Sequence, residues 1–235
     1  MATLAQIRQQ VRLSINQADG TGDFSNSELN GFINEGNRFL AVLVNWPRDR
    51  VEVQVEQGTP GYTLPKDCIS LLLSYFGKES ESGDKLPLTI LSEEQLSSIF
   101  PNWMATDSGS QGRPKYLTLI DKKTAAIYPS PDSDESVTGK KLEIVYSFYP
   151  ATLTDDGQEP ELPPLYHDFL SQYGTYKCYM GKLNNPQLGQ AMLGEIIDKA
   201  KLTKSVVTKE LNIRGFVWGN FCSPDEDYDG TISVK

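Results

Sequence analysis

Cysteine and histidine are scarce in this sequence of 235 residues, which holds three cysteines and one histidine. Cys68, Cys178 and Cys222 lie far apart and form no CxxC pair, so we expect neither a disulfide framework nor a zinc site. His167 is accompanied by no GxSxG or comparable nucleophile motif. Because a catalytic base needs a partner, we interpret His167 as a structural or surface histidine and expect no enzymatic activity.

Basic residues are fewer than acidic residues in this sequence. The chain has 22 Lys and Arg against 31 Asp and Glu, a formal net charge of -9, whereas tight nucleic-acid binding requires clustered cations that displace phosphate counterions. This balance argues against a protein that grips DNA, but it allows an acidic wall past which DNA slides. No apolar run approaches the roughly 18 residues of a membrane helix, and the N-terminus resembles no secretory signal. We therefore expect no membrane association and no export.

Two ligand-binding motifs are matched only in part. Asp19-Gly20-Thr21-Gly22 follows a predicted helix instead of a strand and lacks the GK[ST] ending of a phosphate loop, so we interpret it as a helix-helix turn. The stretch 225–230 supplies carboxylates at positions one, three and five and glycine at six of an EF-hand loop. The glutamate needed at position twelve is missing. We expect a solvated acidic tail, with no metal and no cofactor.

The spacing of apolar residues predicts two helices before residue 47. The first begins at Leu4, ends at Asp19-Gly20 and carries a stripe at steps of three and four: Leu4, Ile7, Val11 and Ile15. The second is expected over 25–45, because Ser25 and Glu28 match a capping box and Phe24 and Leu29 match a hydrophobic staple. It should end before Pro47, since the residue before a proline avoids the helical region.

Two more helices are predicted after residue 150. The third is expected over 164–183. The fourth should start with Pro186 in its first turn, capped by Asn185, and continue along one stripe: Leu188, Met192, Ile196, Lys199, Leu202 and Val206. Glu195 and Lys199 should form an i,i+4 pair on its flank.

Between the helix pairs, residues 47–150 follow the two-residue period of strands. Val51, Val53 and Val55 alternate with polar residues, and a turn at 58–61 leads to 62–64, which predicts a hairpin. Further strands are expected at 69–76, 116–120, 125–128 and 142–148, with a short helix at 93–100. The fold class is therefore α+β, a four-helix bundle with an inserted antiparallel β domain between helices 2 and 3. The expected divisions are 1–46, 47–150, 151–213 and an extended C-terminal arm, 214–235.

The expected arm holds three aromatic residues without helical or strand period: Phe216, Trp218 and Phe221. Exposed aromatic side chains are costly to leave in water and are enriched as interface anchors. They either dock onto another molecule or fold back on their own bundle, and we favour docking.

Several tracts resemble tailed-bacteriophage head-to-tail adaptor proteins, also called connectors. The tracts are 24–36, Gly61-Tyr62-Thr63-Leu64-Pro65, Gly112-Arg113-Pro114-Lys115-Tyr116, Tyr128-Pro129-Ser130-Pro131 and the segment 161–168 that leads into the third helix. Their order and the helix-strand-helix plan cover about 1–210.

The resemblance implies a structural virion protein at the neck, assembled in the host cytoplasm. Its expected form is a dodecameric ring that links the portal to the tail and lets genomic DNA pass without specific binding. Its partners would be the portal protein, neighbouring adaptor subunits and tail proteins, and the arm would grip the portal or a neighbour. The alternatives are another neck or tail ring, such as a stopper or tail-tube component, or a small host-directed enzyme or inhibitor.

Overall fold

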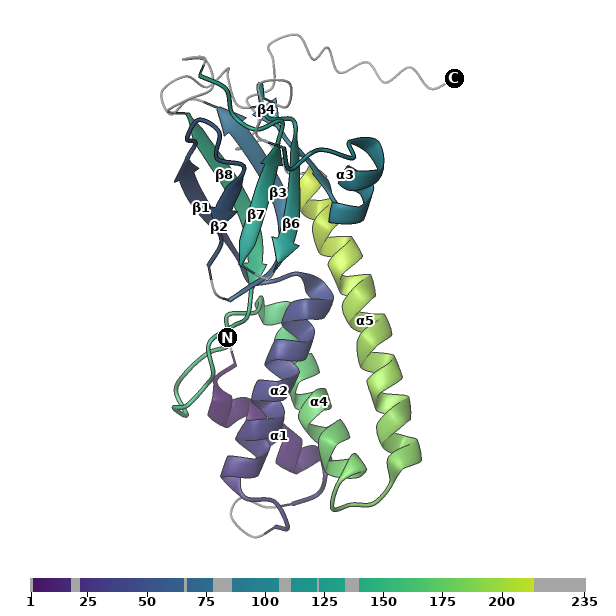
Figure 1. Ribbon diagram of the computed structural model, residues 1–235. Coiled ribbons are helices and arrows are strands. Elements are labelled where there is room, and N and C mark those ends of the chain that lie inside the picture. The colour runs from purple at the N-terminus through teal and green to yellow at the C-terminus, as the bar shows by residue number, and fades with distance from the viewer. Residues whose placement is uncertain are drawn as a thin grey trace. The chain divides into compact units, whose positions relative to one another are not determined.

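The computed structural model describes residues 2–17, 22–65, 67–77, 86–105, 111–121, 123–133 and 140–213, with side chains as far as Val206. These residues form an α+β fold with five α-helices and two four-stranded sheets (Figure 1). Contacts divide the chain into two compact units. The helical unit consists of Met1–Asp49 and Ser147–Val206, and the β unit contains Arg50–Tyr146.

Helix α1, Leu4–Ser14, ends earlier than the sequence predicted. Asn16 adopts a left-handed conformation with φ of 55°, and its N–H donates to the carbonyl of Leu13 while the N–H of Gln17 donates to that of Arg12. These two bonds form a Schellman motif, which satisfies the last carbonyls of the helix. The predicted end at Asp19-Gly20 is therefore wrong, because this local motif closes the helix first.

Helix α2, Asn26–Val44, has the start that the sequence predicted. The hydroxyl of Ser25 accepts from the N–H of Glu28 at 3.2 Å, and the Glu28 carboxylate accepts from the N–H of Ser25 at 2.8 Å, so the capping box is confirmed. Phe24 and Leu29 are buried in one cluster, as the staple requires.

Helix α4, His167–Met180, follows a 3-10 turn, Pro164–Tyr166, and packs against both α1 and α2 (Figure 1). Glycine makes these close approaches possible. A Cβ atom on Gly36 of α2 would lie 2.8 Å from Cδ1 of Tyr173, and one on Gly174 of α4 would lie 2.8 Å from Cγ2 of Val11. Side chains at either position would push the helices apart.

Helix α5, Pro186–Ile213, begins where expected, with the Asn185 side chain accepting from the N–H of Leu188 at 3.3 Å. Its buried face differs from the predicted stripe. Gly189, Ile196 and Ala200 are buried, while Leu188, Leu202 and Val206 are 42, 66 and 48% exposed. The buried positions are thus offset by about one residue from most of the predicted stripe, with Ile196 common to both, and a Cβ atom on Gly189 would lie 2.9 Å from Sδ of Met180.

The sheets have the orders β1-β8-β3-β4 and β2-β7-β6-β5. The strands of the first are β1 Arg48–Gln54, β8 Lys141–Phe148, β3 Cys68–Gly77 and β4 Leu86–Pro87. Those of the second are β2 Gly61–Thr63, β7 Thr124–Tyr128, β6 Tyr116–Asp121 and β5 Thr89–Leu91. Phe76 and Ile144 of the first sheet and Leu117 and Ile127 of the second share one buried core.

Two predictions about this β region are wrong. Strands β1 and β2 form no hairpin, since they lie in different sheets and β2 pairs with β7 instead. A turn signal fixes where the chain bends but not which strand it meets, and the shared core decides the partner. The domain is also not entirely antiparallel, because β5 and β6 pair in parallel. Helix α3, Glu93–Ile99, lies in the connection between them, as a parallel crossover requires.

Candidate functional surfaces

Helix α1 turns its cations inward and leaves an uncharged outer face. Arg8 is 8% exposed and Arg12 is 2% exposed. Arg8 binds Asp156 and Asn30, and Arg12 donates to the Phe24 carbonyl and the Asn26 side chain. The exposed side chains of this helix are Gln6, Gln9, Gln10, Leu13 and Ser14. A face without charge is typical of the centre of a protein-protein interface, where charged residues are depleted.

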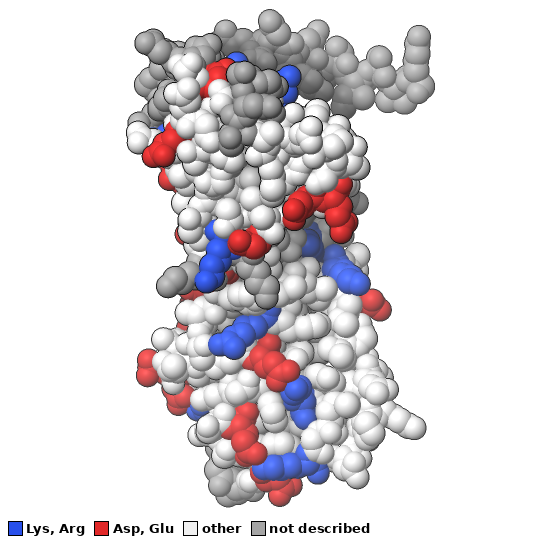
Figure 2. Space-filling view, in the orientation of Figure 1, with Lys and Arg blue, Asp and Glu red and all other residues white. Residues whose placement is uncertain are grey.

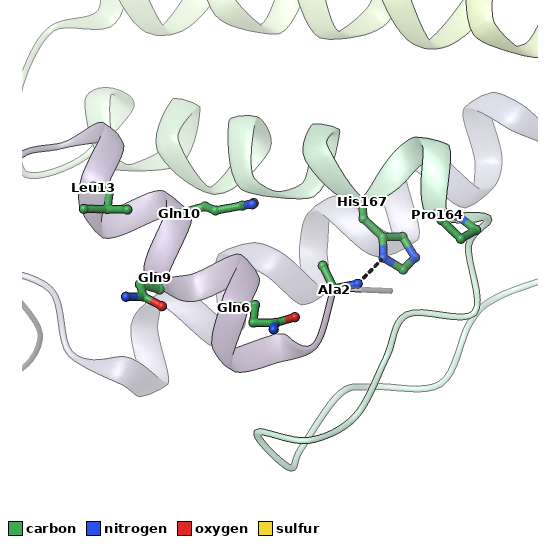
Figure 3. Close-up of a pocket in the computed structure, with 7 residues that line it drawn as sticks. All are labelled: Ala2, Gln6, Gln9, Gln10, Leu13, Pro164 and His167. Atoms are coloured by element: carbon green, nitrogen blue, oxygen red, sulfur yellow. Dashed lines mark hydrogen bonds between the residues drawn. The ribbon is translucent and has the colours of Figure 1, made fainter.

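This face forms one wall of an open groove (Figure 3). It is lined by Ala2, Gln6, Gln9, Gln10, Leu13, Pro164 and His167. Leu13 is 69% exposed, and Leu165, which follows Pro164 in the sequence, is 63% exposed. Amide side chains combined with accessible leucine can bind a protein surface through hydrogen bonds and apolar contact.

His167 is part of the lining of this groove. Its side chain is buried, with Nδ1 3.3 Å from the backbone nitrogen of Ala2 (Figure 3). Nε2 lies 2.8 Å from the carbonyl oxygen of Leu162. If Nδ1 accepts from Ala2, Nε2 carries the proton and donates to Leu162. Both ring nitrogens are then engaged by the backbone, and the lining contains no serine, cysteine or carboxylate that could serve as a nucleophile. The geometry therefore makes His167 a structural residue that holds the N-terminus against α4.

The connection before α4 is fastened to α1 and α2. The N–H groups of Leu4 and Ala5, in the first turn of α1, donate to the carbonyls of Gln158 and Asp156 at 2.8 and 3.1 Å. The side chain of Asn34 exchanges two hydrogen bonds with the backbone of Leu153. These contacts satisfy helix donors that would otherwise need water. They also hold α1, which carries the uncharged face, against the connection before α4.

The β unit carries a second hollow beside α3. It is lined by Glu93, Ser97, Pro101, Asn102, Trp103, Met104 and Ala105. The indole N–H of Trp103 donates to the Ser97 hydroxyl at 2.9 Å, and Ile99 and Met104 are about half exposed. The Phe100 ring packs on Tyr128 with centroids 4.7 Å apart. The lining thus combines the indole of Trp103, held by its hydrogen bond, and the exposed Met104 with polar side chains, which suits a protein contact.

Charges on the helical unit are mixed in sign. On the side drawn in Figure 2, acidic and basic side chains alternate and form no large patch of one sign. Lys177 pairs with Glu35 at 2.9 Å and Lys182 with Glu28 at 2.7 Å. The hydrogen bond from Lys182, followed by those from Ser25, lowers the pKa of Glu28 to about 2. Such pairs orient helices but create no site for a phosphate chain.

The other residues singled out from the sequence have no shared site. Burial raises the pKa of the Cys178 thiol to about 11 and raises that of Cys68, so these thiols are poor nucleophiles. Among the residues that the structure describes, no three His, Cys, Asp or Glu side chains are grouped to hold a metal. In the same part of the chain, no helix is both long and apolar enough to span a bilayer. Phe216, Trp218, Phe221 and the 225–230 motif lie outside the described residues.

The uncharged face of α1 was not anticipated from the sequence. Its signal is the pair Gln9-Gln10 followed by Leu13, with both arginines of the helix at positions that fall on the apolar stripe. Helical spacing alone places Arg8 beside Ile7 and Val11. That Arg8 is buried can be inferred only when its partner, Asp156, is known.

Comparison with known proteins places the chain in one family. A family model described as "SU10 adaptor protein" matches residues 2–207. A search of curated proteins gives no match. A solved structure titled "Neck of empty GTA particle computed with C6 symmetry" is similar at 10% identity, covering 77% of this chain and 82% of that chain with a TM-score of 0.28. A likeness of that size supports no conclusion about fold or function.

Proposed function

Because the chain belongs to the SU10 adaptor protein family, we propose that it is a head-to-tail adaptor at the neck of a tailed phage. In this role it forms a ring that links the portal to the tail and lets DNA pass. The observation that carries the proposal is the family match over residues 2–207, which spans nearly all of the helical unit and the segment Arg50–Tyr146 of the β unit. The resemblance to phage adaptors noted in the sequence is confirmed by this match, which favours a structural role over an enzymatic one.

We assign ring formation to the helical unit. In the proposed arrangement, α5 joins α1, α2 and α4 as the fourth helix of a bundle, and the β domain is an insertion in it. The uncharged face of α1, with Leu13 exposed and the groove beside it, supports a contact with the neighbouring subunit, because interface centres are depleted of charge. Contacts in which one patch of a subunit meets a different patch of its neighbour close into rings when the rotation between subunits permits.

The charge of the chain fits a channel through which DNA moves. Each subunit carries a formal charge of -9, and a dodecamer multiplies this charge by twelve. Carboxylates along the lumen would repel the phosphate backbone weakly and so prevent it from sticking. Specific binding of genomic DNA is not part of the proposal. The site of action is the virion neck, after assembly in the host cytoplasm.

A different ring in the neck or tail, such as a stopper or tail-tube component, is the second candidate. It shares the acidic charge and the structural role. The hollow beside α3, with its fixed Trp103 and exposed Met104, serves equally well as a contact with a tail protein in either ring.

Electron microscopy of neck particles, with sedimentation of the purified chain in the presence and absence of portal protein, tests the proposal. We expect twelve copies on the portal and a lumen rich in carboxylates. A chain that stays monomeric with portal present, or a mainly basic lumen, contradicts it. A ring on the tail side without contact to the portal favours the second candidate.

A further inference from the structure

Helix α5 carries an exposed row beside the face that it buries. The row consists of Leu188, Met192, Glu195, Lys199, Leu202 and Val206. Its members follow alternating steps of four and three residues, so they share one side of the helix. The buried positions Gly189, Ile196 and Ala200 lie roughly a third of a turn away at about 100° per residue. The row is therefore a lateral surface that the helical unit leaves uncovered.

All the strongly exposed large apolar residues described in α5 belong to this row: Leu188, Leu202 and Val206. Met192 is half-buried, while Glu195 and Lys199 are exposed and form an ion pair with each other. Two apolar residues thus stand at each end of the row, and one acidic and one basic residue stand in the middle.

Read from either end, the row gives two apolar residues, two charged residues and two apolar residues, and the signs of the two charges are exchanged between the two directions. If a second α5 is laid against it in the opposite direction, Leu188 faces Val206 of the other copy and Met192 faces Leu202. Glu195 then faces Lys199 of the other copy, twice by symmetry. In heptad terms, Leu188, Glu195 and Leu202 are d positions, and each lies opposite an a position. A parallel arrangement would instead place Glu195 against Glu195 and Lys199 against Lys199.

We propose that this row is an interaction surface for a second copy of the chain, and that the two α5 helices pair antiparallel about a two-fold axis that passes midway between Glu195 and Lys199. The apolar ends supply contact area, and the central charges fix direction and register, because every other register or direction leaves them unmatched. With only two apolar layers at each end, the pair is weak and reversible.

This pairing is independent of the proposed ring. A two-fold contact uses the same patch on both copies and closes on itself, whereas ring neighbours meet through two different patches. The α5 pair is therefore a state of the free protein, and the α1 face remains available for the neck. Either proposal can fail without the other.

Charge reversal in the full chain, without portal, tests the pair by sedimentation equilibrium. We expect the wild type to show a reversible monomer-dimer equilibrium. Glu195→Lys or Lys199→Glu alone should raise the dissociation constant by on the order of tenfold or more, because each puts like charges opposite each other. Mixing the two variants should restore association, and so should the double reversal in one chain.

The mixture contains its own control for the ion pair within α5. Neither variant regains that pair when the two are mixed, so recovery can come only from contact between chains. Circular dichroism should show equal helicity for all variants. Single variants that associate as the wild type does, or a mixture that does not recover, would overturn the proposal.

Cysteine cross-linking tests the direction. In a chain with Cys222→Ser, Leu188→Cys mixed with Val206→Cys should form a disulfide between chains, while Leu188→Cys alone should not. Self-cross-linking of Leu188→Cys would show a parallel pair and would contradict the inference.

Discussion

The guanidinium of Arg8 makes two parallel hydrogen bonds with the carboxylate of Asp156, at 2.8 and 2.9 Å. Residues 148 positions apart in the sequence are thereby joined, and the hydrogen bond from Arg8 lowers the pKa of Asp156. The same contact holds one of the two positive charges of α1 on the inner side of the helix, while Arg12 is held there by Phe24 and Asn26. The ion pair thus joins the connection before α4 to α1 and contributes to the uncharged surface that we assign to a neighbouring subunit.

Replacing this arginine by lysine should weaken the helical unit. Arg8→Lys keeps the charge but loses the two-pronged geometry, so we expect the melting temperature to fall by a few degrees. Arg38→Lys is the matched control, because Arg38 makes a single exposed hydrogen bond, to Thr152. Thermal unfolding followed by circular dichroism measures both. Equal shifts for the two variants would contradict the assigned role of Arg8.

The capping carboxylate of Glu28 should make stability depend on pH. Its pKa is about 2 in the folded chain against an ordinary value of 4.5, so between these values the unfolded chain binds more protons. The stabilisation is complete above about pH 5 and is lost as the pH falls toward 2. We expect Glu28→Gln to melt below the wild type at pH 7 and to approach it near pH 2. The exposed Glu159→Gln should show no such convergence.

Two glycines of α2 should respond to alanine in opposite ways. Gly36→Ala places a Cβ atom 2.8 Å from Tyr173, so we expect a loss of about 1–3 kcal/mol of unfolding free energy from overpacking. At Gly31 nothing lies within 4 Å of the new Cβ, and Gly31→Ala should gain up to about 1 kcal/mol from helix propensity. Urea titration gives both values. A stable Gly36→Ala would show that α2 and α4 are less tightly packed than described.

Removing the chain after Ile213 tests the predicted arm. We expect the circular dichroism and melting of the remaining chain to be nearly unchanged, while attachment to portal-bearing heads is abolished. The reason is that Phe216, Trp218 and Phe221 would be interface anchors, each worth about 2 kcal/mol or more. Wild-type attachment of the truncated protein would exclude docking, and unfolding of its core would show that the aromatics pack on their own bundle.

The sequence by itself determined the type of most elements and the starts of α1, α2 and α5, whereas α4 begins at His167, three residues later than predicted, after a 3-10 turn. Ser25 with Glu28, and Asn185 before Pro186, are local signals whose hydrogen bonds form within four residues, so they are readable without a fold. The order of helices, strands and helices follows from periodicity for the same reason. Charge and the lack of a nucleophile motif likewise need no coordinates.

Only the tertiary structure decided which elements meet. The pairing of β2 with β7, the parallel contact of β5 with β6 and the buried face of α5 depend on partners far along the chain. Helical spacing permits either Leu188 or Gly189 to face inward, and close packing selects the glycine. Arg8 shows the same limit, since an arginine on an apolar stripe is explained only by the carboxylate of Asp156 that meets it.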